Sequence, residues 1–107
     1  MRYFLVLLDE LTTGSTRELG AGDHDLFVDF MLARNVILLG GGFDEKIGDS
    51  YAAYVLVADD GAAALAVAAE DPLMRHGHVS LRVVEWQLVG INRRTIDPAQ
   101  VLESAGD

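Results

Sequence analysis

The apolar segments of this chain follow an order that limits the folds it can adopt. The first of them, Tyr3 to Leu8, does not alternate with polar residues, which is typical of a strand buried on both faces. Strands are predicted at 2–9, 36–39, 51–58 and 79–89, and helices at 23–35 and 61–70. The order β-α-β-β-α-β predicts a ferredoxin-like α+β domain, in which two helices cover one face of a four-stranded antiparallel sheet.

Local signals set the expected ends of the first helix and the second strand. Asp23 is a plausible N-cap and Asn35 a plausible stop for the first helix. The glycine- and threonine-rich segment 10–22 before this helix is expected to be a loop. Gly40–Gly42 are expected to end the second strand.

The second half of the chain carries similar signals. Asp59 and Asp60 are expected to cap the alanine-rich helix, and Asp71-Pro72 to end it because proline disfavours helical geometry in the preceding residue. One short helical turn is expected from Leu73 to Gly77. In the last strand the alternation slips by one residue near Val83-Val84, which predicts a β-bulge.

Length and composition restrict the class of protein. A chain of 107 residues predicts a single domain, here residues 1–90, followed by a tail, 91–107, with a short helix starting at Asp97-Pro98. The formal net charge of −9 argues against nucleic acid as a partner. The absence of cysteine excludes disulfides and thiolate chemistry. No apolar run approaches the roughly 20 residues that span a bilayer, so we expect a cytoplasmic protein without a membrane partner.

The second face of the predicted sheet is not covered by the predicted helices. The first three strands carry apolar residues on both sides, whereas two helices cover only one side. Monomers rarely leave a large apolar patch in water. We therefore expect a homodimer in which two sheets pack face to face and form a quaternary barrel.

Several short motifs, in this order and spacing, resemble the YciI-like (YCII-related) protein family. The opening MRYFLVLLDE is similar to that family's first strand, and His24 to its histidine. ARNVILLGGGF resembles its helix end, second strand and glycine-rich turn. AAEDPLMRHG resembles its Asp-Pro segment, with Asp71 at the aspartate. The resemblance covers roughly residues 1–90.

The resemblance implies a ferredoxin-like fold, a dimeric α/β barrel and a catalytic site at His24 and Asp71. One known activity in the family is dehydrochlorination of a hydroxyquinol-type aromatic compound. The wider superfold includes muconolactone isomerases and cofactor-free monooxygenases.

The residues themselves allow two interpretations of this pair. A helix N-terminus disfavours an imidazolium cation and would keep His24 neutral and able to act as a base; alternatively, His24 is a surface residue. Asp71 is either a helix-ending turn residue or an anion placed against the negative end of the alanine-rich helix. If Asp71 accepted a hydrogen bond from His24, it would fix the imidazole tautomer. That contact is implied only by the resemblance.

Other candidates complete the sequence-based picture. Gly41, Gly42 and Arg75 are predicted to bind a small-molecule substrate. His76 and His78 have the spacing of a metal pair on a strand, although an exposed turn is the simpler interpretation, and no metal or cofactor is expected. Tyr51 and Tyr54 are assigned to the core or the dimer interface.

The sequence therefore predicts a small cofactor-free enzyme with a His–Asp dyad. The dyad would transfer a proton, in lyase or isomerase chemistry, on a small organic substrate, with aromatic-derived compounds as one candidate class. The alternative is a non-catalytic dimeric module that binds a small molecule or acts as an accessory protein.

Overall fold

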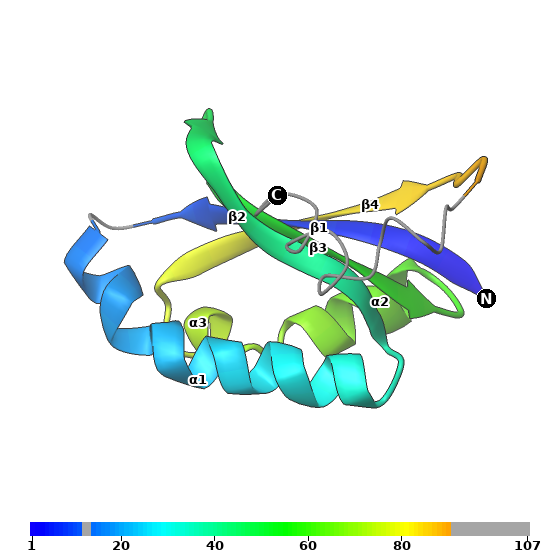
Figure 1. The fold of residues 1–107 in the computed structure, drawn as a ribbon, viewed down its shortest axis with the longest axis horizontal. Helices are drawn as coiled ribbons and strands as arrows, with labels where there is room; N and C mark the ends of the chain where they lie inside the picture. The colour runs from blue at the N-terminus through cyan, green and yellow to red at the C-terminus, as the bar shows by residue number, and fades with distance from the viewer. Residues whose placement is uncertain (12–13, 91–107) are drawn as a thin grey trace, which may run out of the picture.

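The computed structural model describes residues 1–11 and 14–90, with residues 14–21 as backbone. Its elements are β1 (Arg2–Glu10), α1 (Gly14–Ala33), β2 (Ile37–Ile47), β3 (Ser50–Ala58), α2 (Gly61–Ala68), α3 (Pro72–Arg75) and β4 (Val79–Trp86). The four strands form one antiparallel sheet in the order β2-β3-β1-β4 (Figure 1). The predicted ferredoxin-like α+β plan is confirmed, and α3 is the short helical turn expected after Asp71-Pro72.

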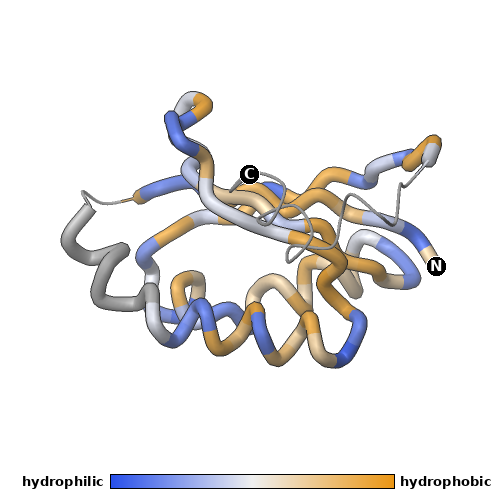
Figure 2. The backbone as a smooth tube through the Cα atoms, viewed as in Figure 1, coloured by the Kyte–Doolittle hydropathy of each residue, from blue (hydrophilic) through white to orange (hydrophobic). Residues whose placement is uncertain are grey.

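The helices lie together on one face of the sheet (Figure 1). Hydrophobic residues concentrate along the central strands and on parts of the helices (Figure 2). Every second residue of β1 is buried between the sheet and the helices, because side chains alternate along a strand. The buried core consists of Phe4, Val6, Leu8, Met31, Ile37, Tyr54, Leu56, Ala58, Ala64, Ala68, Leu73 and Val79.

The first helix is longer than predicted. It begins at Gly14, so the expected loop over 10–22 is wrong, and Asp23 lies inside α1 and not at its N-cap. A glycine inside a helix costs only about 1 kcal/mol, and adding residues to an existing helix is far easier than nucleating one. The helix ends near Asn35, whose φ of 61° is the left-handed conformation expected of a stop.

The glycines of 40–42 do not end the second strand, which is a second correction. β2 runs through them to Ile47, and the chain turns at Gly48, whose φ is 61°. At Gly40 an added Cβ would lie 2.7 Å from the Cβ of Tyr54, so a side chain there would collide with β3. Gly40 therefore permits close approach of two strands within the sheet.

The bulge predicted at Val83-Val84 is wrong. β1 and β4 pair without interruption from Tyr3↔Trp86 to Glu10↔Val79. The apparent slip in the pattern arises because residues on both faces of β4 are apolar. A register shift occurs instead between β1 and β3, where Tyr51 is passed over.

Two aspartates cap the helices of the second half. Asp60 is the predicted N-cap of α2 and accepts a hydrogen bond from the Ala63 backbone N–H at 2.8 Å. Asp71 is the N-cap of α3, because Pro72 opens a new helix directly after it. The Asp71 backbone N–H also donates to the Ala68 carbonyl at the end of α2, at 3.1 Å, so Asp71 lies between the end of one helix and the start of the next.

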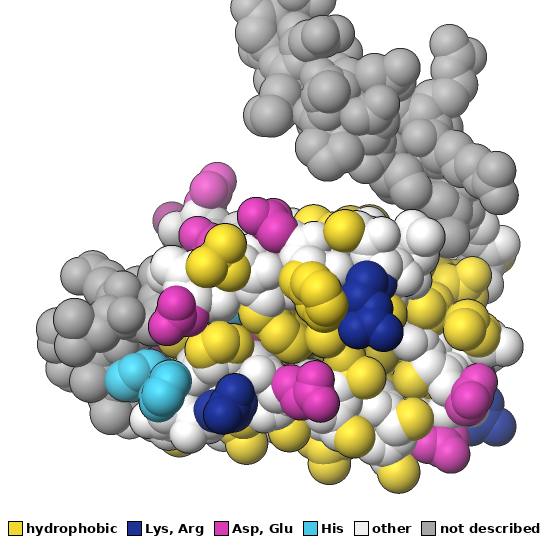
Figure 3. Space-filling view, turned by 90° about the horizontal axis from the view of Figure 1, so that it is seen from below, with side chains coloured by type: hydrophobic (Ala, Val, Ile, Leu, Met, Phe, Trp, Pro, Cys, Tyr) yellow, Lys and Arg dark blue, Asp and Glu magenta, His cyan; other side chains and the backbone are white. Residues whose placement is uncertain are grey.

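The sheet face opposite the helices is open in the single chain. It carries Leu39, Val84 and Trp86, each exposed by about half. By contrast, hydrophobic side chains on the helical face are interspersed with charged ones (Figure 3). No described helix is long and apolar enough to cross a membrane. The predicted tail, 91–107, with its short helix lies outside the described residues.

Candidate functional site

The structure brings His24 of α1 and Asp71 together, although they are 47 positions apart in the sequence. His24 Nδ1 lies 2.7 Å from Asp71 Oδ2. The Asp71 side chain is fully buried, and that of His24 is 17% exposed. The pair thus has one end in the protein interior and the other at the surface.

The carboxylate of Asp71 is held by the start of α3. Its Oδ1 accepts a hydrogen bond of 3.0 Å from the Leu73 backbone N–H, and Oδ2 remains for His24. Leu73 is itself in the core at 2% exposure, which fixes α3 against the sheet. Both carboxylate oxygens therefore have defined partners, as a buried carboxylate requires.

This arrangement assigns the roles of the two imidazole nitrogens. A carboxylate only accepts hydrogen bonds, so the contact with Asp71 places a proton on Nδ1 of His24. In the neutral imidazole the other nitrogen, Nε2, then has a free lone pair. A histidine held in this way can accept a proton from a bound molecule. His24 lies inside α1 and not at its N-terminus, so the hydrogen bond to Asp71, and not the helix end, orients its imidazole.

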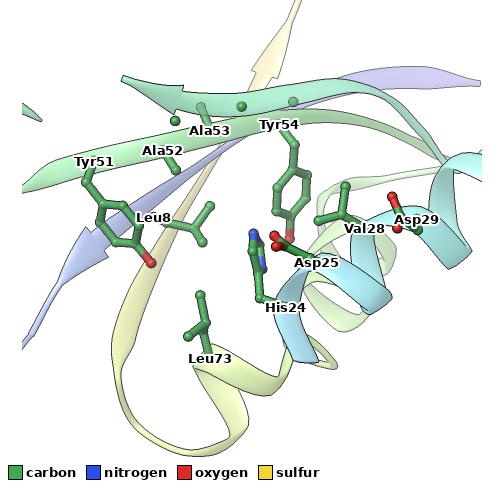
Figure 4. Close-up of a pocket in the computed structure, with 13 residues that line it drawn as sticks. Leu8, His24, Asp25, Val28, Asp29, Tyr51, Ala52, Ala53, Tyr54 and Leu73 are labelled. Atoms are coloured by element: carbon green, nitrogen blue, oxygen red, sulfur yellow. The ribbon is translucent and has the colours of Figure 1, made fainter. Parts of the chain in front are cut away.

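His24 lines a cleft of about 590 Å³ between α1, α3 and the sheet (Figure 4). Most of its other lining residues are apolar or glycine. The lining consists of Leu8, His24, Asp25, Val28, Asp29, Gly40, Gly41, Gly42, Tyr51, Ala52, Ala53, Tyr54 and Leu73. Its volume is within the range of small-molecule pockets.

Two tyrosines extend from β3 into this region (Figure 4). Tyr51 is the residue passed over in the β1–β3 pairing, and such a bulge turns a side chain away from strict alternation. Tyr54 is 2% exposed. Burial, with a smaller contribution from the negative charge of Asp71, raises the pKa of the Tyr54 hydroxyl far above its usual value. Tyr54 thus stays neutral beside the dyad.

Asp25 and Asp29 also line the cleft, and sequence reasoning did not select them. They are one turn apart on α1, and their carboxylates point toward the sheet (Figure 4). The signal was present in the sequence: residues 24, 25, 28 and 29 share one side of a continuous helix.

The remaining predicted site residues separate into two groups. Gly41 and Gly42 line the cleft with His24. Arg75 lies elsewhere, in a groove of the helical layer lined also by Phe27, Phe30, Met31, Ala66, Ala69 and Glu70.

His76 and His78 lie side by side but gain no further ligand. Their ring centroids are 6.2 Å apart. Within residues 1–11 and 14–90, no three histidine, aspartate or glutamate side chains form a group that could hold a metal ion. His24, the remaining histidine of the chain, contacts Asp71.

A second polar cluster joins three strands of the sheet. Asp9 of β1 accepts hydrogen bonds from Arg82 Nε at 2.7 Å and from the Ser50 hydroxyl. The same guanidinium donates to Ser50 Oγ at 2.7 Å. The hydrogen bonds from Arg82 and then from Ser50 lower the pKa of Asp9. This cluster has no counterpart among the predicted site residues.

Comparisons with known proteins support the fold. No family model matches the chain, and no curated protein matches it. Among solved structures, the chain is similar to 5-chloro-2-hydroxyhydroquinone dehydrochlorinase (TftG) from Burkholderia phenoliruptrix AC1100, in complex with 2,5-dihydroxybenzoquinone. The TM-score is 0.63 at 18% sequence identity, and the match covers 79% of this chain and 93% of that one. The similarity shows a common α+β fold.

Proposed function

We propose that the protein is a small cofactor-free enzyme that transfers a proton on an aromatic-derived organic substrate, using His24 as base and Asp71 as its positioning partner. The observation that carries this proposal is the 2.7 Å contact between His24 Nδ1 and the buried carboxylate of Asp71, at the wall of a cleft. A buried carboxylate that orients a histidine is the arrangement of many general bases.

The proposed step follows from this geometry. Nε2 of His24 accepts a proton from a hydroxyl or C–H group of the substrate, and the electron pair left behind expels a leaving group as its anion or moves a double bond. Asp71 stabilises the resulting imidazolium through Nδ1–H. The reaction is an elimination or an isomerisation and needs no external oxidant or reductant.

The structural neighbour gives the first substrate class to examine. TftG is a dehydrochlorinase of a chlorinated hydroxyhydroquinone, and loss of HCl is an elimination of the proposed type. We therefore propose hydroxylated aromatic compounds as substrates, with a chlorinated hydroquinone as the first compound. Gly41 and Gly42, which line the cleft without side chains, would leave room for such a ring.

We also propose that the protein is a homodimer formed through the open sheet face. The exposed Leu39 lies on β2, and the exposed Val84 and Trp86 lie on β4, so both edge strands of that face carry apolar side chains. Burial of such side chains stabilises an interface by about 25 cal/mol per Å² of apolar area. A second copy of the same sheet would cover them symmetrically.

The proposal is tested by measuring chloride release from chlorinated hydroquinones with the wild-type protein and with His24→Gln. We expect the variant to remain folded by circular dichroism and to lose at least about 100-fold in turnover. Arg82→Gln, which alters the other polar cluster, is the control and should retain turnover. A folded His24→Gln protein with wild-type turnover would contradict the proposal.

A further inference from the structure

The cleft around His24 has a marked excess of negative charge. Asp25 and Asp29 lie at its wall, both exposed and one turn apart on α1 (Figure 4). Behind His24 lies the buried carboxylate of Asp71. The pair formed by His24 and Asp71 carries a charge of −1 when the imidazole is neutral and 0 when it is protonated, so it does not offset the two exposed carboxylates.

Positive side chains are absent from the described lining of this cleft. Lys46 pairs with Glu10, Arg82 with Asp9, and Arg2 with Glu85. Arg34 stacks on the ring of Phe30, its guanidinium carbon 5.2 Å from the centroid. Arg75 lines the separate groove. A carboxylate ligand would therefore find no described guanidinium or ammonium group to bind it, although these are its usual partners.

We infer that Asp25 and Asp29 make the cleft selective against anions, so that its ligands are uncharged or cationic ring compounds and not carboxylic acids. This inference rests on the proposed use of the cleft as the ligand site and narrows its substrate class. At the dielectric constant of water, one carboxylate about 7 Å from an anionic ligand weakens the binding of that ligand about threefold. Two such carboxylates together weaken it about tenfold. The effect decreases as salt screens the charges.

Three probes of nearly equal size isolate the charge: benzoate is anionic, benzamide neutral and benzamidine cationic. Their dissociation constants are measured by NMR shifts of the His24 ring in about 20 mM salt, where screening is weak. We expect benzoate to bind about tenfold more weakly than benzamide, and benzamidine at least as tightly as benzamide. In about 0.5 M NaCl the difference between benzoate and benzamide should shrink to about twofold.

The matched variants are Asp25→Asn/Asp29→Asn and, as control, Asp59→Asn/Asp60→Asn. The control removes the same charge at the start of α2, outside the cleft, and asparagine still caps that helix. The cleft variant should bring benzoate to within about twofold of benzamide and weaken benzamidine, with benzamide unchanged. The control should keep the wild-type ratio.

Three results would overturn the inference. The first is equal binding of benzoate and benzamide by the wild-type protein. The second is the same change in the ratio of their dissociation constants in both double variants. The third is no NMR shift of the His24 ring at a probe concentration of about 20 mM. The outcome is independent of turnover. Selective binding without any turnover would leave the inference in place and remove the proposed reaction, whereas turnover by a protein that binds benzoate as well as benzamide would do the opposite.

Discussion

Asp71 and Asp9 each form hydrogen bonds through both carboxylate oxygens, and they differ in the side chains that they contact. Asp71, at the start of α3, contacts His24 of α1 and is fully buried. Asp9 contacts Arg82 and Ser50, and the Arg82 side chain is 58% exposed. Arginine remains charged at all ordinary pH values, whereas histidine gains and loses a proton near neutrality.

Because of this difference, the Asp9–Arg82 contact only links strands, whereas the Asp71–His24 contact is a candidate for proton transfer. The contact of Asp9 with Arg82 joins β1 to β4 and cannot take part in proton transfer near pH 7, since neither group changes its charge there. The contact of Asp71 with His24 joins α3 to α1 and leaves Nε2 of a titratable ring at a cleft. Short hydrogen bonds alone therefore do not mark a functional site, but the titration range of the partner does.

The largest difference is expected when each carboxylate is removed. Asp71→Ala leaves the Leu73 N–H and His24 Nδ1 buried without an acceptor and removes the α3 cap, which should lower the free energy of unfolding by about 2–4 kcal/mol. Asp9→Ala should cost clearly less, because water can replace its contact with the exposed guanidinium. Urea unfolding of both variants measures the two values. A larger loss in Asp9→Ala would reverse the comparison.

The second prediction concerns acid. The folded-state pKa of Asp9 is lowered below its usual value of 3.8, so its hydrogen bonds contribute stability that is present above about pH 4 and lost as the pH falls through the folded-state pKa. The unfolding free energy of the wild type should therefore fall more steeply below pH 4 than that of Asp9→Asn. Urea midpoints between pH 3 and pH 7 test this difference. Parallel curves for the two proteins would mean that Asp9 does not contribute.

The smallest effect is expected from Tyr54, the neutral group beside Asp71. Burial, then the charge of Asp71, raises its pKa in the folded protein above the usual tyrosine value of 10.0. Its contribution to stability is present below pH 10 and is lost as the pH rises above it, because the unfolded chain ionises first. Tyr54→Phe should flatten the alkaline loss of stability, whereas Tyr3→Phe, on the open face, should not. Phenolate absorbance and thermal unfolding from pH 9 to pH 11.5 measure both.

The fold could be predicted from the sequence because its signals are local. Apolar strands, an alanine-rich helix and the cap at Asp60 each depend on neighbouring residues. One error arose where longer-range packing decides, because Gly40 lies inside a strand opposite Tyr54. Another arose because the helix continues back to Gly14 through glycine, serine and threonine, whose helix propensity is low.

The site could be predicted only in part. No local pattern relates His24 to Asp71, and the resemblance to a family provided that pair. Asp25 and Asp29 follow from helical periodicity, because they share one side of the predicted helix 23–35 with His24. Arg75 was selected for its charge, but its position on α3 places it in another groove.

The imidazole tautomer of His24 tests the central claim most directly. Long-range ¹H–¹⁵N NMR at about pH 8 distinguishes a protonated from an unprotonated ring nitrogen. In the wild type we predict a proton on Nδ1 and a free lone pair on Nε2. In Asp71→Asn the side-chain amide can donate to Nδ1, and we predict the proton on Nε2 instead. A wild-type ring protonated on Nε2, or a tautomer unchanged in Asp71→Asn, would contradict the dyad.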